Sequence, residues 1–255
     1  MNDVIVSMTS FPPAVKYAVG AVKSILRGSL LPDKLVLYLT LADFGEGELP
    51  QELIDLEREN SVFEIRDYGQ DIRSYRKLVP ALTDFPDSII VTVDDDVDYH
   101  PDMLKELVEW HRRYPDRVIA HRAKRIRPGH AYKKWSKFRW YDFVGRRDRA
   151  GFDVIQTGVA GVLYPPHSLR KDMIDAELFT ALAPTADDLW FWAAAVANGR
   201  AVMPVPFGRN KPRSLGKPRA LSLKTVNFKT GTDRNLEALN AILARYPEIH
   251  ARLCK

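Results

Sequence analysis

The sequence predicts an α/β fold in which a mostly parallel central sheet is flanked by helices. Strand-like and helix-like segments alternate over the first hundred residues, as in strand-helix-strand units. The chain has 255 residues, of which 45% are hydrophobic, which is enough for a full core. An apolar, β-branched run at 89–93 ends in a group of acids, as expected of a buried strand that reaches the edge of a sheet.

The first elements follow from apolar periodicity and from the breakers between them. After the Pro12-Pro13 turn, apolar side chains from Val15 to Leu26 keep the spacing of one helical face. The strands are short β-branched runs. In chain order we expect a strand at 4–8, a helix at 14–27, a strand at 35–40, a helix at 51–59, a strand at 62–66, a helix at 74–82, a strand at 89–93 and a helix at 101–114.

Beyond residue 114 the alternation weakens. We expect a strand between the glycines at 158–161 and Pro165-Pro166, a helix at 189–197 that stops at Asn198-Gly199, and a last helix at 234–246. Residues 121–150 mix basic and aromatic side chains without periodicity, so we interpret them as a partly ordered insertion. No repeat or boundary divides the chain, and we expect a single domain over residues 1–255.

Charge and cysteine content narrow the class of protein. The net charge is +5, but residues 121–149 carry +9 and residues 209–229 carry +7, which leaves −11 on the rest of the chain. Such basic segments usually meet phosphate, nucleic acid or an anionic membrane face. The single cysteine, Cys254, excludes an internal disulfide and a cysteine-rich zinc site. No run of about 18 apolar residues and no signal peptide is evident, so we expect a cytoplasmic protein.

Four acids follow the 89–93 strand within five positions: Asp94, Asp95, Asp96 and Asp98. Adjacent carboxylates repel one another unless a cation lies among them. Hard oxygen ligands suit Mg²⁺ or Mn²⁺, and these ions usually complete their shells with water and substrate phosphates. The run therefore predicts a divalent cation and a phosphate-bearing ligand. The alternative is an acidic turn in which Asp98 or Asp102 caps the next helix.

A second acidic pair, Asp187 and Asp188, precedes the helix at 189–197. Neighbouring carboxylates push the pKa of one of them upward, which is how a general base is tuned. The alternative is N-capping, with both negative charges favourable at the start of a helix. Trp190 and Trp192 are expected in the core or against a sugar.

Residues that follow other strands are candidates for nucleotide binding. Thr9, Ser10 and Phe11 come after the first strand, and an aromatic ring beside small hydroxyls suits stacking on a base and hydrogen bonds to its edge. The alternative is a proline-stiffened loop with Phe11 packed inward. Asp67, just beyond the third strand, would also face the base.

Arg73, at the start of the helix predicted near 74–82, and Lys77, within it, lie four residues apart. Residues at this spacing share a helical face, so both could reach a diphosphate. We favour Lys77 for this role. A solvated helix face is the alternative for either residue.

Five short motifs occur in an order that resembles a known family. They are SMTSFP at 7–12, DIRSYRKL at 71–78, TVDDD at 92–96, GVAGVLYPP at 158–166 and DDLWF at 187–191. Together they resemble the GT-A glycosyltransferases, specifically the family 2-like enzymes of bacterial capsule and lipopolysaccharide assembly, over nearly the whole chain. The resemblance implies the GT-A (Rossmann-like) form of the α/β fold, a nucleotide-sugar donor, and sugar transfer to a growing cell-surface glycan.

The resemblance also implies roles for the acids that follow the 89–93 strand. They match the DxD signature, in which Asp94 faces the nucleotide ribose. Asp95 is expected to contribute to binding of the nucleotide sugar. Asp96, together with Asp94, would hold Mn²⁺ or Mg²⁺ on the diphosphate. A second register, Asp96 to Asp98, satisfies the same pattern. A cation on the diphosphate would stabilise the charge that develops on the leaving group.

The same resemblance implies that Asp188 is the catalytic base and Asp187 its orienting or acceptor-binding neighbour. Asp188 would deprotonate the acceptor hydroxyl, whose oxygen attacks the anomeric carbon from the face opposite the nucleotide, and transfer would be inverting. The donor is expected to be UDP- or GDP-linked, without a choice between them. The acceptor is expected to be a glycan or a lipid-linked glycan.

The two basic segments admit several interpretations. The insertion at 121–150 would rest on the anionic inner face of the cell membrane, bind an anionic glycan, or remain a solvated loop. The basic loop at about 207–232, with Arg209, Lys211, Arg213 and residues 225–233, is expected to close over the diphosphate. His250, in the last helix, is expected on a solvated face rather than on a metal.

Two other classes of protein compete with the transferase. Basic segments interleaved with aromatics suit single-stranded nucleic acid, and clustered acids suit a metal-dependent nuclease. Against this, the acids end one central strand and the remaining surface is acidic, so we expect no nucleic-acid partner. A nucleotidyltransferase would need a glycine-rich basic loop after its first strand, and the sequence has none there.

Overall fold

The structure is a computed structural model that describes residues 2–45, 49–138, 140–143, 149–206, 211–221 and 233–253. Its described part contains a seven-stranded sheet. The strands of this sheet are β1 (Val4–Thr9), β2 (Lys34–Leu39), β3 (Phe63–Asp67), β4 (Ile89–Thr92), β6 (Val118–Ala120), β10 (Val162–Tyr164) and β11 (Val202–Pro204).

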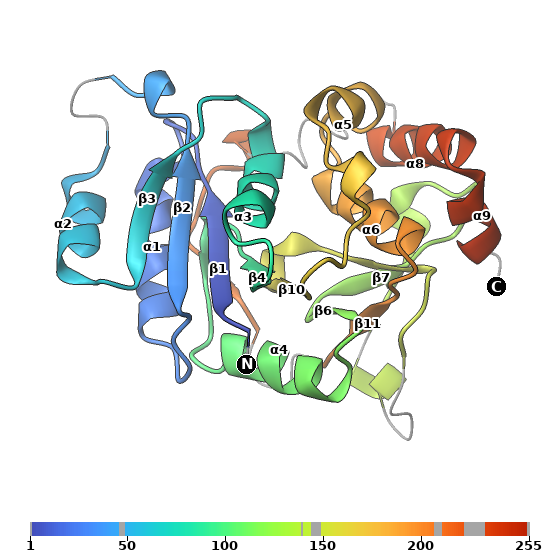
Figure 1. Ribbon diagram of the computed structural model, residues 1–255, viewed down its shortest axis with the longest axis horizontal. Helices are drawn as coiled ribbons and strands as arrows, with labels where there is room; N and C mark the ends of the chain where they lie inside the picture. Colours follow the sequence, from blue (N-terminus) through green and yellow to red (C-terminus); the bar gives the residue numbers. More distant parts are fainter. Residues whose placement is uncertain are drawn as a thin grey trace.

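The strand order is β11-β6-β10-β4-β1-β2-β3 (Figure 1). β1 pairs in parallel with β2 and β4, β2 with β3, and β11 with β6. β10 is antiparallel to both of its neighbours, β4 and β6. The predicted α/β architecture with a mostly parallel central sheet is therefore confirmed, and the carboxyl ends of β1, β2, β3 and β4 meet at one edge of the sheet.

Helices cover both faces of the sheet. They are α1 (Val15–Leu26), α2 (Gln51–Glu59), α3 (Val79–Asp84), α4 (Met103–Arg113), α5 (Ala176–Leu182), α6 (Asp187–Ala197), α8 (Arg234–Arg245) and α9 (Pro247–Leu253). Figure 1 shows α5, α6, α8 and α9 gathered at one end of the molecule, with α2 at the other.

Alternate residues of a strand pack into two separate hydrophobic cores, one on each face of the sheet. In β1, Val4, Val6 and Met8 pack with side chains of α1 and α4, whereas Ile5 belongs to the core that contains α5, α6, α8 and α9. Such alternation, with apolar residues on both sides, is that of a strand buried on both faces. Trp190 and Trp192 of α6 are fully buried, so the core alternative for these two residues is correct.

The helix predicted at 74–82 is wrong in part. A 3₁₀ helix, η2 (Arg73–Lys77), comes first, and α3 begins only at Val79. Pro80 lies in the first turn of α3, where proline is tolerated, and because it has no N–H to donate to the preceding turn, one unbroken helix cannot run through it. Because a 3₁₀ helix has three residues per turn, Arg73 and Lys77 do not share a face. Arg73 is exposed with a φ of 54°, whereas Lys77 is buried.

The helix predicted at 234–246 is confirmed as α8, and a further helix, α9, begins at Pro247. His250 lies on α9 and is exposed, as expected. Within the described residues, no helix is long and apolar enough to cross a membrane.

The basic and aromatic segment at 121–150 contributes to a small antiparallel sheet. Its order is β8 (Ser136–Lys137), β7 (Ala123–Arg125) and β9 (Val154–Gln156). Trp135 is buried, and the Lys124 ammonium lies 3.3 Å from the centre of the Tyr132 ring. The described part of this segment therefore packs onto the body of the protein.

Two glycines with positive φ offer a test of the packing between β10 and α4. A Cβ at Gly161 (φ 89°) would lie 2.9 Å from Met103 Sδ, whereas one at Gly129 (φ 72°) would meet nothing within 4 Å. We expect Gly161→Ala to lower the free energy of unfolding by about 2–4 kcal/mol, because left-handed strain and overpacking add. Gly129→Ala should cost about 1 kcal/mol from strain alone. Urea denaturation measures both, and equal losses would contradict the packing.

Candidate active site

Acidic side chains from two distant motifs gather at the carboxyl ends of β1 and β4. The acids at 94–96 follow β4, and Asp187 and Asp188 form the first turn of α6. The two groups meet at Lys77, whose Nζ lies 2.9 Å from Asp187, 3.3 Å from Asp94 and 3.9 Å from Asp188. The structure therefore brings the predicted lysine together with acids of both motifs.

Lys77 is the electrostatic centre of this cluster. Its side chain is only 8% exposed. Burial by itself lowers the pKa of an ammonium, but Asp187, Asp94 and Asp188 together hold the pKa of Lys77 well above its usual value. A buried charge is tolerated only when it is paired, and here each partner stabilises the other. Lys77 thus forms ion pairs with the carboxylates themselves, whereas the sequence predicted that it would contact a diphosphate.

Lys77 is positioned by η2, whose neighbouring side chains anchor this short helix. Successive residues of a 3₁₀ helix project about 120° apart. Tyr75 projects into the core, where its ring stacks on Phe179 with centroids 4.0 Å apart and its hydroxyl donates to the Ala183 carbonyl at 2.6 Å. With Tyr75 held in this way, the backbone directs Lys77 toward the acids.

Arg76 ties η2 to the loop after β1. Its buried guanidinium donates to Thr9 Oγ1 at 3.0 Å, to the Ser10 carbonyl at 3.3 Å and to Thr40 Oγ1. Thr9 Oγ1 in turn donates to a β2 carbonyl. Phe11, at the tip of this loop, is 37% exposed, so the interpretation in which it packs inward is wrong. The loop is thus rigid at its base and presents an aromatic ring to solvent.

Asp188 has the properties of a proton acceptor. Burial raises the pKa of its carboxyl to about 7; Lys77 opposes this rise, while Asp187 and Asp94 add to it. The Gly158 amide donates to Asp188 Oδ2 at 3.0 Å. A Cβ at Gly158 would lie 2.8 Å from Lys77 Nζ and 3.2 Å from Asp188 Oδ1, so glycine is required for this close approach.

The acids at 95 and 96 have a lysine of their own. Lys217 Nζ lies 2.7 Å from Asp95 Oδ1 and 3.0 Å from Asp96 Oδ2. Ser10 donates to Asp95 Oδ2 at 2.5 Å. Asp95 is buried, and it links the loop after β1 to the segment that carries Lys217.

The structure decides between the alternatives left open for the acids. Asp98, the end of the second DxD register, forms an ion pair with Arg27, which directly follows α1. Neither Asp187 nor Asp188 caps α6: its N-cap residue is Ala186, and no side chain caps that end. Plain N-capping is therefore wrong for this pair, and the Asp94–Asp96 register is the one whose acids face the cluster.

Asp67 is separate from the acids. Its carboxylate, exposed at the end of β3, accepts a hydrogen bond from the Leu41 amide at 2.8 Å. It lies at the same edge of the sheet, two strands from β1. In the basic loop at 207–232, Arg209 and residues 222–232 lie outside the described residues, whereas Lys211 and Arg213 are described and exposed.

The acids can be tested for their fit to a divalent cation. Asp94 and Asp96 offer the carboxylate oxygens that Mg²⁺ or Mn²⁺ prefers, and their side chains are 30% and 25% exposed. Within the described residues, no group of three or more His, Cys, Asp or Glu side chains could hold a metal. With two such carboxylates, a cation here would take few protein ligands and complete its shell with water and phosphate, and Lys217 now pairs with Asp96. Metal binding stays a prediction.

Comparison with known proteins bears on the fold. No protein-family model and no curated protein matches this sequence. Among solved structures, the chain is similar to S. aureus TarS 1–349, with a TM-score of 0.57 and 12% identity over 96% of this chain and 73% of that one. The fold is that of the GT-A glycosyltransferases. A second structure of S. aureus TarS gives a TM-score of 0.53 and 12% identity over 81% of this chain and 35% of the TarS chain.

This likeness confirms the GT-A fold that the resemblance of the five motifs implied. At 12% identity it speaks for the GT-A fold and not for a substrate. In open α/β sheets, ligands bind beyond the carboxyl ends of the strands. The acid cluster around Lys77 lies at such an edge, and we take it as the candidate active site.

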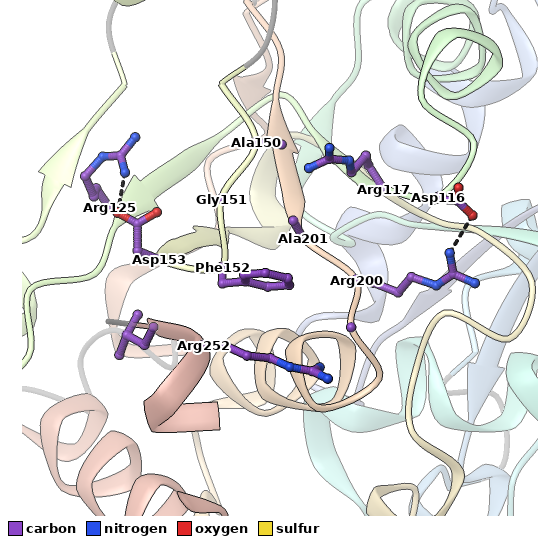
Figure 2. A pocket seen from close by; sticks show the side chains of 12 residues that line it. Asp116, Arg117, Arg125, Ala150, Gly151, Phe152, Asp153, Arg200, Ala201 and Arg252 are labelled. Atoms are coloured by element: carbon purple, nitrogen blue, oxygen red, sulfur yellow. Dashed lines mark hydrogen bonds and ion pairs between the residues drawn. The ribbon is translucent and has the colours of Figure 1, made fainter. Parts of the chain in front are cut away.

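A separate pocket of about 810 Å³ lies where β6 and β11 begin, at the opposite end of the sheet (Figure 2). Its arginines are largely engaged: Arg125 pairs with Asp153, Arg200 pairs with Asp116, and Arg252 donates to carbonyls at the end of α6. Because these three arginines are already engaged within the protein, we assign no chemistry to this pocket.

Sequence analysis missed three residues of the site. Arg76, which ties η2 to the loop after β1, has no role in the sequence-based prediction, where its neighbour Lys77 is the favoured cation. Gly158 opens the GVAG motif, which was a usable signal, since a glycine there permits close backbone approach. Lys217 lies in the basic loop that the sequence predicts at the site, but no local pattern distinguishes it from the other cations of that loop, and the tertiary fold brings it to Asp95 and Asp96.

The raised pKa of Asp188 predicts a specific pH dependence of stability. Its folded pKa of about 7 exceeds the ordinary value of 3.8, so the folded state binds more protons between these values and stability falls as pH rises through this window. The loss has an upper limit of about 4 kcal/mol. We expect Asp188→Asn to become more stable relative to the native protein as pH rises from 5 to 8, in urea denaturation followed by tryptophan fluorescence. Parallel pH profiles would contradict the assignment.

Proposed function

We propose that this protein is a glycosyltransferase that moves a sugar from a nucleoside-diphosphate sugar to a hydroxyl of a growing cell-surface glycan. The observation that carries the proposal is the Asp188 carboxylate, held by the Gly158 amide beside Lys77 at the strand edge of a GT-A fold. The likeness to TarS supports the GT-A fold on which the proposal rests, and the surface-glycan acceptor comes from the resemblance of the five sequence motifs.

Asp188 is the base in this proposal. With a pKa near 7 its carboxylate is basic enough to take a proton from an acceptor hydroxyl at neutral pH. The acceptor oxygen then attacks the anomeric carbon from the face opposite the nucleotide, the bond to the diphosphate breaks, and the configuration inverts. Asp187 is held by Lys77 and orients the base.

The donor would lie across the ends of β1 and β4. Thr9, Ser10 and Phe11 are proposed to contact the nucleotide, with the exposed Phe11 ring available for stacking. Asp94 and Asp95 would face the nucleotide sugar. Asp67 is proposed for the base, although its carboxylate is engaged by the Leu41 amide.

Asp96 and Asp94 are proposed to hold Mn²⁺ or Mg²⁺, which when bound would neutralise the diphosphate and stabilise it as a leaving group. Lys77 remains with the acids and keeps them close together. The donor nucleotide, UDP or GDP, and contact with the anionic inner face of the membrane through residues 121–150 belong to the same proposal. The nucleic-acid alternative is not favoured, because the structural neighbours are glycosyltransferases.

Nucleotide binding can be measured without an acceptor. We expect one of UDP, GDP, CMP, dTDP and ADP, together with Mn²⁺, to stabilise the protein in thermal unfolding. At 100 times the Kd the gain is about 2.7 kcal/mol. Asp96→Ala should abolish it. Asp98→Ala is the matched control, because Asp98 belongs to the same acidic run but pairs with Arg27. Stabilisation by single-stranded nucleic acid, and by none of the nucleotides, would refute the proposal.

Catalysis by Asp188 predicts a separation of binding from chemistry. Asp188→Asn keeps an acceptor for the Gly158 amide but loses the proton acceptor, so the transfer rate should fall by a factor of about 10² to 10⁴. The Kd for the nucleotide should change little. In the native protein, kcat/KM should rise with pH to a plateau above about 7. A variant that retains full activity would show that another group accepts the proton.

A further inference from the structure

A short segment crosses the acid cluster and carries Lys217. We call residues 211–221 the strap. Its strand β12 (Arg213–Ser214) pairs with β5 (Val97–Asp98), which directly follows the acids at 94–96. The Leu215 amide donates to the Asp96 carbonyl at 2.8 Å. The backbone of the strap is therefore attached to the same stretch of chain that bears the acids.

The side chains of the strap continue this attachment. Leu215 packs on Gly20 of α1, where a Cβ would lie 2.8 Å from Leu215 Cδ1. Gly216 has a φ of 83° and open space around it, so its role is to turn the backbone. The turn brings Lys217 back to the acids, where its side chain is only 11% exposed.

Lys217 occupies the position at which a cation would neutralise Asp95 and Asp96. Its Nζ lies within 3.0 Å of an oxygen of each carboxylate. Mg²⁺ bonds its oxygen ligands at about 2.0–2.1 Å, so an ion bound to these oxygens would lie against the ammonium. Two positive charges in contact at a largely buried site repel strongly. Ammonium and divalent cation therefore compete for these carboxylate oxygens.

The cluster nevertheless retains an excess of negative charge. Asp94, Asp95, Asp96, Asp187 and Asp188 face two ammonium groups, those of Lys77 and Lys217. A diphosphate adds further negative charge at this edge. A divalent cation therefore gains more from the cluster than a single ammonium does, especially when a diphosphate is present.

We propose that Lys217 is the resident counter-ion of Asp95 and Asp96, and that a divalent cation bound by Asp96 and Asp94 displaces it from Asp96. Lys217 contributes one of the contacts that hold the strap, together with the β12–β5 pairing and Leu215. Cation binding therefore loosens the strap at Lys217 while its attachment to β5 remains. This inference rests on the proposed function, in which Asp96 holds the cation.

The experiment measures Mn²⁺ binding by electron paramagnetic resonance, with no nucleotide present. Lys217→Met removes the ammonium and keeps an unbranched side chain, so the Kd for Mn²⁺ should fall by at least about tenfold. Lys211→Met is the matched control: it removes the same charge from the same strap at an exposed position. Its Kd should stay within about twofold of the native value.

Each result decides the proposal. Tighter Mn²⁺ binding in Lys217→Met alone supports it, including the case in which the native protein binds no detectable Mn²⁺. An unchanged or weaker affinity overturns it, as does an equal gain in Lys211→Met, which would reflect net charge only. Because the titration contains no nucleotide, its failure leaves the nucleotide stabilisation of the native protein unaffected, and the two proposals fail separately.

A second measurement uses the native protein and does not depend on a folded variant. Trace acetylation, read by mass spectrometry, reports how available each lysine amine is. If Mn²⁺ displaces Lys217, its labelling should rise several-fold as Mn²⁺ binds, while Lys77 stays protected by its own three carboxylates. Bound Mn²⁺ with unchanged Lys217 labelling would show that the two cations bind independently, and the proposal would fail.

Discussion

The candidate site depends on one buried ammonium, that of Lys77, and on the three carboxylates around it. Asp94 and Asp187 come from opposite halves of the chain, and both carboxylates contact Lys77 within 3.3 Å. Without the ammonium, these acids and Asp188 would repel one another at an edge where burial makes each charge costly. Lys77 therefore fixes how closely β4 and α6 approach, and this spacing sets the environment of Asp188.

The position of Lys77 follows from the 3₁₀ geometry of η2. Tyr75, Arg76 and Lys77 are consecutive and buried, yet they reach the α5 side of the core, the loop after β1 and the acid cluster. An α-helix would separate these directions by about 100° rather than 120° and would keep residues four apart on one face. The short helix thus links the proposed nucleotide loop to the proposed base through adjacent residues.

The strap adds a second layer of charge compensation. Lys77 pairs with Asp94, Asp187 and Asp188, which we call the inner acids. Lys217 pairs with Asp95 and Asp96, the outer pair. The two lysines differ in how they are held. η2 is anchored in the core. Among the described residues, the contacts of the strap apart from Lys217 are a two-residue strand pairing, the Leu215 amide hydrogen bond to Asp96 and the packing of Leu215 on Gly20. The inner ammonium is therefore structural, and the outer one is the group that can be exchanged as ligands arrive.

The sequence by itself determined five of the seven strands described in the sheet, most of the helices and the acids at the edge of the sheet, but not β6 and β11. Strand and helix periodicity is local, and the carboxyl ends of parallel strands meet at one edge, so Asp94 to Asp96 could be placed without tertiary information. The motif order also predicted the GT-A fold. Only the tertiary structure decided the partners of these acids. η2 departs from the expected helix because Pro80 starts α3 anew, and Lys217 reaches Asp95 from a remote segment. Ion pairs between distant segments leave no periodic signal, because they depend on backbone paths that no local pattern records.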